Sequence, residues 1–539
     1  MAKMPLGAPL RSVFLLAMAL WAVSAATAAA DPRWGGLAPG PYAVGFRSEW
    51  RFDVSRTYRS ATSLNATYGE AKSPRPILVN VWYPSRPGTG VAMTHASYFD
   101  IAAASPVQVV GLASALSAYA RDIAAAYTLD APLAELTDED RRAAVALFSH
   151  PIAPRRNADA AGGRFPLIIY HPGYGSSFED NAVLCEFLAS QGFVVVSSAF
   201  IRRDGESFNI DAAEGSLADI GFLISTASGW PNVDWSRIGL VGHSGGAHTA
   251  LRYQASGQSA VDAIVSLDTT QDSHNVSNPA WSHVAIVLGN LEYMTTPALI
   301  AAPPTAFYQL AERMDQADRF LVTVPELEHN DFISQGTLAT EAATPAKPGA
   351  PRVRDQYDRL VRTVLTFLNA ELRGDQTAMT RLTDSTPDDG LVADVEFLPK
   401  GVKRVRPYDP ASSTAPTPAQ LRHLVEDHGM AAGLAALERF KADGGLSIYA
   451  PTFAAVWLMD LSTANDPGAT TLFEFYQRLD ARLAARIKST LSVWARLHGD
   501  RPAVAVLWQR ALVRFYPDDA AARTRLDAME AAMAPSSTD

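Results

Sequence analysis

Residues 237–248 read RIGLVGHSGGAH, and this stretch decides the fold. Its first part, 238–241, is short and apolar, as in a buried strand, and residues 247–255 have a helical composition. Between them, Gly242 and Gly246 are part of a Gly-x-Ser-x-Gly motif around Ser244, which forms a nucleophile elbow when it joins a strand to a helix. Side chains at either glycine would collide with the neighbouring strand and helix in so tight a turn. We therefore expect Ser244 to lie exposed at the edge of a sheet.

The sequence on both sides of the elbow alternates strands with helices. Apolar runs predict strands at residues 77–83, 167–170, 193–197, 238–241, 264–267, 298–301 and 320–324. Helical patterns lie between them, and a long helix with Val361, Val364 and Leu368 on one face follows the last strand. Such alternation is typical of a mostly parallel sheet with helices on both faces. Together with the elbow, it predicts an α/β-hydrolase fold.

Composition divides the chain into segments. We expect a signal peptide at 1–30, N-terminal strands of the hydrolase at 31–92, a helical insertion at 93–160, the catalytic core at 161–375, a linker at 376–415 and a helical-repeat-like domain at 416–535. The linker is predicted from TPDDG at 386–390 and from five prolines between Pro399 and Pro418. Beyond it, Gly499 between two helices and Pro517 after the second loosely resemble a tetratricopeptide unit. Helices that simply pack on the hydrolase are an equal alternative.

The N-terminus has the order of a secretory signal peptide. Lys3 and Arg11 precede an apolar run at 13–23 and small residues up to Ala30, where cleavage is expected. The protein is therefore expected to be exported, to the periplasm or the medium. The run is shorter than the roughly 20 residues of a membrane span, so no stable span is expected. The full chain has 539 residues, a formal charge of −10 and no basic stripe, which argues against nucleic acid as a partner.

The catalytic base is expected at His329. A serine hydroxyl needs a base to take its proton and an acid to orient that base. In this fold the three occur along the chain in the order serine, acid, histidine, and we expect the histidine after the last strand. Residues 325–332, PELEHNDF, follow that strand and contain His329. Histidines further along, such as His423 and His428, lie in the helical segment.

The acid has three candidates. Asp268 directly follows the strand at 264–267, and active sites form at the carboxyl ends of parallel strands. Many hydrolases of this kind place the acid after a later strand, but residues 301–305, AAPPT, contain no carboxylate there. Asp268 is therefore preferred, with Asp272 and Glu292 as alternatives.

Backbone amides are expected to hold the negative charge that develops on the substrate oxygen. One should come from Gly245, at the start of the helix after Ser244. The other should come from HPGYGSS at 171–177, after the strand at 167–170. Pro172 has no N–H and Gly173 permits a sharp bend, so Tyr174 is the expected second donor. His171 and His243 are expected to shape these loops through local hydrogen bonds.

Several stretches together resemble one family. They are FPLIIYHPGYG at 165–175, GHSGG at 242–246, SLD at 266–268 and EHNDF at 328–332, with GPYAVG at 40–45 and VWYP at 81–84. This set resembles the platelet-activating-factor acetylhydrolase-like and dienelactone hydrolase-like α/β-hydrolases over about residues 40–372. The resemblance implies Ser244 as nucleophile, Asp268 as acid and His329 as base, with the amides of Tyr174 and Gly245 as oxyanion donors. The insertion and the C-terminal helices depart from the family, which leaves the substrate open.

The expected activity is hydrolysis of a small-molecule or lipid-like carboxylic ester through an acyl-enzyme, without cofactor or metal. Esters are preferred because of the resemblance, and an amidase or peptidase with the same triad is an alternative. A different alternative is a hydrolase-like scaffold that binds a protein partner through residues 416–535. The complete set of serine, aspartate and histidine argues against a scaffold, because binding does not need all three.

Overall fold

The structure, a computed structural model, describes residues 32–57, 74–101, 105–129, 135–173, 175–201, 214–256, 261–268, 296–302, 311–312, 314–324, 326–342, 350–384, 390–412, 415–440, 445–479, 481–497 and 502–533. The signal peptide expected at residues 1–30 lies outside the described residues. So do Tyr174, Asp272 and Glu292.

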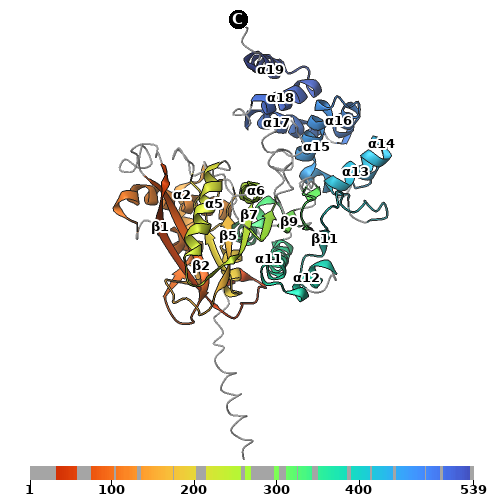
Figure 1. Ribbon diagram of the computed structural model, residues 1–539. Coiled ribbons are helices and arrows are strands. Elements are labelled where there is room, and N and C mark those ends of the chain that lie inside the picture. Colours follow the sequence, from red (N-terminus) through yellow and green to blue (C-terminus); the bar gives the residue numbers. More distant parts are fainter. Residues whose placement is uncertain are drawn as a thin grey trace, which may run out of the picture.

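One mixed sheet organises the N-terminal three quarters of the chain (Figure 1). Over the described ranges its strand order is β11-β10-β9-β8-β7-β5-β6-β2-β1-β4-β3. The strands from β6 to β10 run parallel to one another, whereas β2 pairs antiparallel with both β6 and β1. The bounds are β1 (Ala43–Thr57), β2 (Pro74–Ser85), β3 (Val91–Thr94), β4 (Pro151–Arg156), β5 (Phe165–His171), β6 (Val194–Ser197), β7 (Val233–His243), β8 (Ala263–Leu267), β9 (Ala298–Ala302), β10 (Arg319–Thr323) and β11 (Asp394–Leu398).

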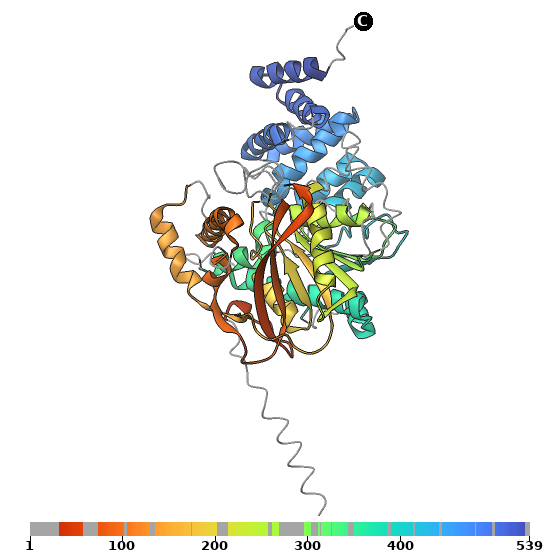
Figure 2. The ribbon, with the colours of Figure 1, turned by 60° about the vertical axis from the view of Figure 1, so that its left-hand side comes forward.

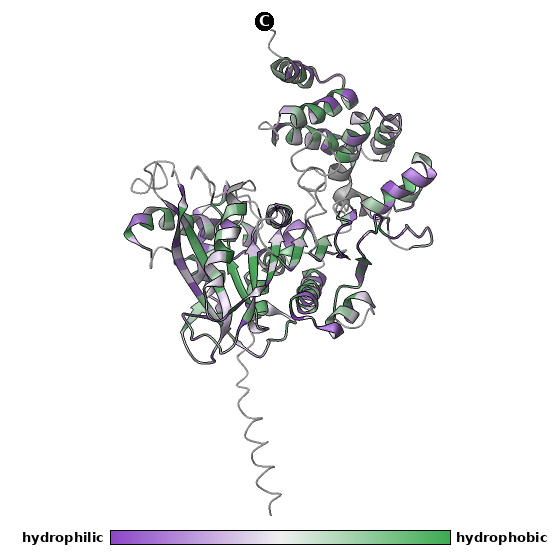
Figure 3. Ribbon diagram, in the orientation of Figure 1, coloured by the Kyte–Doolittle hydropathy of each residue, from purple (hydrophilic) through white to green (hydrophobic). Residues whose placement is uncertain are grey.

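Helices cover both faces of this sheet. Alternate residues of β5 show why: Leu167 and Ile169 pack in one apolar cluster, while Ile168 and Tyr170 pack in another. The first cluster includes α5 (Glu214–Ser228) and α6 (Gly245–Ala255), and the second includes α4 (Ala182–Ser190) and α11 (Ala350–Arg373). The central strands are accordingly hydrophobic in Figure 3. This sheet, its two helical layers and the strand–elbow–helix at β7 and α6 define the predicted α/β-hydrolase fold.

The order of the central strands locates a site. β5 lies between β6 and β7, so the chain passes from β5 to β6 on one side and then crosses back to β7 on the other. The loops that leave the carboxyl ends of β5 and β7 therefore diverge at a topological switch point. Ligands of open α/β sheets bind at such a point.

Residues 93–160 are less purely helical than expected. They contain α2 (Val110–Leu129) and α3 (Asp138–Phe148), which lie beside the β1 edge of the sheet in Figures 1 and 2. However, β4 also lies there, parallel to β1 and antiparallel to β3. Of the described residues, only Val107–Leu129 is long and apolar enough to cross a membrane, and half of its most apolar window is buried within the protein. The turn η2 (His95–Phe99) and α3 pack against α2 and form a small apolar core with it.

The linker expected at residues 376–415 is wrong in its first half. It contains α12 (Gln376–Thr383) and β11, which pairs antiparallel with β10 and extends the sheet. Val395 and Leu398 of β11 are buried in the apolar clusters on opposite faces of the sheet, whereas Asp394 and Glu396 are partly exposed. The strand is five residues long and lies between turn residues and prolines, so its pattern is weak in the sequence. Its stability comes from pairing with β10.

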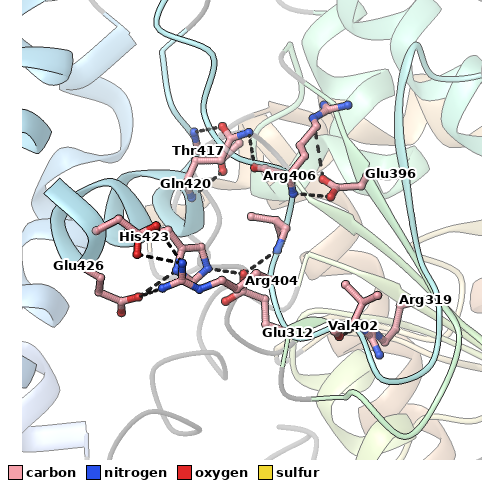
Figure 4. Close-up of polar contacts among 12 residues, drawn as sticks. Glu312, Arg319, Glu396, Val402, Arg404, Arg406, Thr417, Gln420, His423 and Glu426 are labelled. Carbon is pink, nitrogen blue, oxygen red and sulfur yellow. Dashed lines mark hydrogen bonds and ion pairs between the residues drawn. The ribbon is translucent and has the colours of Figure 1, made fainter.

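The C-terminal part is helical, and both apolar packing and polar contacts join it to the rest of the protein. Its helices are α13 (Pro418–His428), α14 (Met430–Arg439), α15 (Gly445–Thr463), α16 (Gly468–Leu479), α17 (Ala481–Leu497), α18 (Pro502–Phe515) and α19 (Ala520–Met533). Buried residues such as Leu421, Leu437 and Trp508 belong to the same apolar cluster as α5 and α6. Figure 4 shows polar contacts of this junction, where His423 of α13 reaches Glu312 over 2.5 Å. The apolar core on that face of the sheet therefore continues into the helices.

Candidate active site

Ser244 lies in a strained turn between β7 and α6. Its φ is +53° and its ψ is −122°, a combination that non-glycine residues rarely adopt. A Cβ added at Gly242 would lie 2.5 Å from backbone atoms of Gly246 and Ala247, and one at Gly246 would lie 2.2 Å from the His171 carbonyl oxygen. Both glycines are therefore required by close backbone contacts, as the motif predicted. The elbow places Ser244 at the carboxyl end of β7, beside the switch point. Ser244 is not exposed there as expected, because the residue is only 6% exposed between the loops that meet at the elbow.

Asp268 and His329 come together beside this turn. His329 Nδ1 donates to Asp268 Oδ2 over 2.5 Å, although the two residues are 61 positions apart in the chain. Asp268 follows β8 with φ +48°, and its N–H donates to the Ala301 carbonyl. Its side chain is 1% exposed, whereas that of His329 is 38% exposed. A buried carboxylate thus holds a partly exposed imidazole.

Backbone contacts connect Ser244 to this pair. The N–H of Ser244 donates to the carbonyl of Leu267, the residue before Asp268, over 2.9 Å. On the other side, His243 Nε2 donates to the His329 carbonyl over 3.0 Å. Ser244, Asp268 and His329 therefore belong to one closed ring of contacts that includes His243. The structure brings together the three residues that the sequence singled out.

The two neighbouring histidines are buried and lie against backbone carbonyls. Burial, followed by the proximity of His329, lowers the pKa of His243 to about 3. Burial also lowers the pKa of His171 to about 4, and its Nδ1 lies 2.9 Å from the Pro172 carbonyl oxygen. Both rings are therefore neutral at ordinary pH. The bond from His243 to the His329 turn was not expected, because nothing in the local sequence links residues 86 positions apart.

Two segments meet at the elbow. Gly245 is the first residue of α6, where helix N–H groups have no partner within the helix. Across from it, a Cβ at Gly173 would lie 2.9 Å from His243 Nδ1 and 3.4 Å from Ser244 Cβ, so the loop after β5 packs directly on the elbow. The expected donor Tyr174 lies outside the described residues, between this glycine and Gly175.

Among the residues that the structure describes, no cluster of three or more histidine, cysteine or acidic side chains could hold a metal ion. Cys185 is buried on α4. Burial raises the pKa of its thiol well above the usual value, so the thiolate is not formed at neutral pH.

Comparisons with known proteins found no relative in sequence and a distant structural likeness. The chain matches no model of a known protein family. It also matches no curated protein in sequence. Among solved structures it is similar to a ferulic acid esterase from Streptomyces cinnamoneus, with 17% sequence identity and a TM-score of 0.44, over 67% of this chain and 98% of that one. Ferulic acid esterase activity is a property of the Streptomyces protein.

Proposed function

We propose that the protein is an exported serine hydrolase that cleaves carboxylic esters through an acyl-enzyme. The observation that supports this proposal most is the 2.5 Å bond between Asp268 and His329 beside the strained turn of Ser244. A strained serine, a half-exposed imidazole and a buried carboxylate together have no evident structural purpose. They are the three parts that nucleophilic catalysis by a hydroxyl requires.

In the proposed acylation step, Ser244 Oγ attacks the ester carbonyl carbon while His329 Nε2 takes the hydroxyl proton. The buried Asp268 fixes the ring so that Nδ1 carries its own proton, and it stabilises the imidazolium that forms. The amides of Gly245 and Tyr174 hold the tetrahedral oxyanion. The alcohol then leaves with the proton from His329, and the acyl group stays on Ser244.

Deacylation repeats these steps with water as the nucleophile. His329 takes a proton from the water, the hydroxide attacks the acyl carbon, and the proton returns to Ser244 Oγ as the acid leaves. The residues need no redox partner or metal for this cycle. The sequence stretches that resemble platelet-activating-factor acetylhydrolase-like and dienelactone hydrolase-like enzymes favour esters over amides. The signal-like N-terminus supports a periplasmic or secreted location.

The substrate class can be tested with chromogenic esters of graded acyl length. We expect hydrolysis by the wild type, and we expect Ser244→Ala to lower turnover by a factor on the order of 10⁴ to 10⁶. Circular dichroism of Ser244→Ala should match the wild type, because removing a hydroxyl leaves the fold intact. A folded Ser244→Ala protein that kept more than a few per cent of the activity would show that another group is the nucleophile.

A further inference from the structure

Three consecutive buried residues connect the loop after β5 with the turn that carries His329. They are Glu179, Asp180 and Asn181, each 0% exposed, and we call them the polar bracket. They lie just before α4, between the loop that follows β5 (residues 171–177, the oxyanion loop) and the core. None of them has a part in the proposed chemistry. Burying three polar side chains in a row is costly unless each is hydrogen-bonded, so their partners are informative.

One side of the polar bracket holds the oxyanion loop. Asp180 Oδ1 accepts from the Tyr170 hydroxyl over 2.6 Å, and Asp180 Oδ2 accepts a longer bond from the Gly173 N–H over 3.4 Å. Glu179 Oε1 accepts from the Ser177 hydroxyl over 2.5 Å. Because Gly173 packs on the side chain of Ser244, the carboxylate of Asp180 sets how the loop rests against the elbow.

The other side holds the segment that carries the base. The turn η7 (His329–Phe332) begins with His329 and leads into α10 (Ser334–Ala342). Asn181 Nδ2 donates to the Phe332 carbonyl over 3.2 Å, and Asn181 Oδ1 accepts from the Ser334 N–H over 3.1 Å.

The first turn of α10 bonds to the polar bracket as well. Gln335 contributes two bonds, from its N–H to the Asp180 carbonyl and from Nε2 to Glu179 Oε1, over 3.0 and 3.1 Å. α10 in turn packs tightly on the base turn, since a Cβ at Gly336 would lie 1.9 Å from the Asn330 carbonyl oxygen. A shift of the polar bracket would therefore move both loops.

We propose that Glu179, Asp180 and Asn181 are positioning residues, which fix the oxyanion loop and the His329 turn relative to each other and hold Gly173 against Ser244. The inference rests on the proposed serine-hydrolase function. It assigns the three residues no contact with substrate.

The charge state of the polar bracket is compatible with this role. Burial raises the pKa of Glu179 to about 8 and that of Asp180 to about 6. At neutral pH Glu179 is therefore mostly protonated and Asp180 mostly ionised. One negative charge, bonded to Tyr170 and Gly173, then lies behind the loop instead of two.

The test compares Asp180→Ala with Asp180→Asn in the full chain. The number of active sites is first titrated with a fluorophosphonate, and kcat and KM for a chromogenic ester are then expressed per titrated site. We expect Asp180→Ala to lower kcat per site by a factor on the order of 10 to 100, since displacements of about 1 Å have effects of this size. KM should change by less than about threefold, because binding of the ground state does not need the oxyanion donors.

Asp180→Asn is the conservative variant. Its amide oxygen can accept from the Gly173 N–H while its NH₂ donates to the Tyr170 hydroxyl, so kcat per site should stay within about threefold of the wild type. Leu188→Ala is the control for stability, because Leu188 is buried on α4 in the apolar cluster that also contains Tyr170. It should lower the melting temperature and leave kcat per site unchanged.

The outcomes separate this inference from the proposed function. A wild type that neither reacts with the fluorophosphonate nor turns over the ester would overturn the proposed function. If the wild type reacts and Asp180→Ala has the same kcat per site as the wild type, the positioning role alone is overturned. If Asp180→Ala does not fold, Gln335→Leu removes the side-chain bond to Glu179 and should lower kcat per site by about fivefold without an equal change in KM. An unchanged kcat for that variant would likewise contradict the role.

Discussion

At the residue scale, the proposed mechanism depends on one orientation of the His329 ring. Asp268 provides it by accepting from Nδ1 over 2.5 Å, which leaves Nε2 as the nitrogen that can take the proton of Ser244. The burial of Asp268 strengthens this bond, because little water competes for the carboxylate. An amide in its place would keep the shape and favour the wrong tautomer.

We therefore predict that Asp268→Asn lowers turnover of an ester by a factor on the order of 10³ to 10⁴, while the protein stays folded. Steady-state kinetics with the same chromogenic ester provide the measurement. Asp272→Asn and Glu292→Gln, which alter the two alternative acids, serve as controls and should have little effect. If Glu292→Gln were the variant that lost activity, the acid would follow a later strand than β8, and the assignment of Asp268 would be wrong.

At the scale of elements, the elbow requires β7, α6 and the loop after β5 to approach within backbone contact. Gly246 is the point of closest approach, so Gly246→Ala should destabilise the protein by about 3 kcal/mol, the upper end of the usual cost of overpacking. Gly162→Ala is the matched control, because an added Cβ there has no atom within 4 Å and should change stability by less than about 0.5 kcal/mol. Urea unfolding measures both. Equal stability of the two variants would show that the turn is looser than described.

The elements that the sequence predicts are those with strong local signals. The strands β5, β6, β8, β9 and β10 and the second half of β7 are short and mostly apolar, and the elbow glycines mark a turn that few other residues permit. The proposed acid and base are also preferred from chain order, because Asp268 directly follows one parallel strand and His329 follows the last of them. Each of these signals is contained in one short segment of the chain.

Features that depend on distant partners were missed. β11 is an edge strand whose alternation is brief, and its place in the sheet depends on pairing with β10. The bond between His243 and the His329 turn joins residues 86 positions apart. Asn181 reaches Phe332 across 151 positions. Three polar residues before an apolar helix were a signal in the sequence, yet their partners could be found only in the folded chain.

At the scale of the whole molecule, the C-terminal helices are joined to the sheet by charged groups as well as by the apolar core. His423 lies between Glu312, at 2.5 Å, and Glu426, at 3.0 Å, and Arg404 binds Glu426 over 2.8 Å (Figure 4). The hydrogen bond with Glu312 is the largest influence on the pKa of His423 and raises it above 6.5. Protonation of one ring therefore strengthens the junction.

A histidine whose pKa is raised on folding contributes stability in full below its unfolded pKa of 6.5, and loses that contribution as pH rises through the higher folded value. Glu312→Gln keeps the shape and removes the charge that raises this pKa. We predict that it lowers the apparent melting temperature relative to the wild type at pH 6, and that the difference shrinks at pH 9. Glu474→Gln, on an exposed position of α16, is the control and should show no such trend. A difference that grew with pH would contradict the role of His423.

The most direct test of the central claim is reaction of the wild-type protein with a fluorophosphonate, followed by peptide mapping by mass spectrometry. The account predicts one adduct per chain, on Ser244, since the elbow and the imidazole of His329 activate that hydroxyl and no other. His329→Ala should slow the labelling strongly while the protein remains folded. A folded wild type that forms no adduct, or forms it on a residue other than Ser244, would contradict the proposal that this protein is a serine hydrolase with Ser244 as its nucleophile.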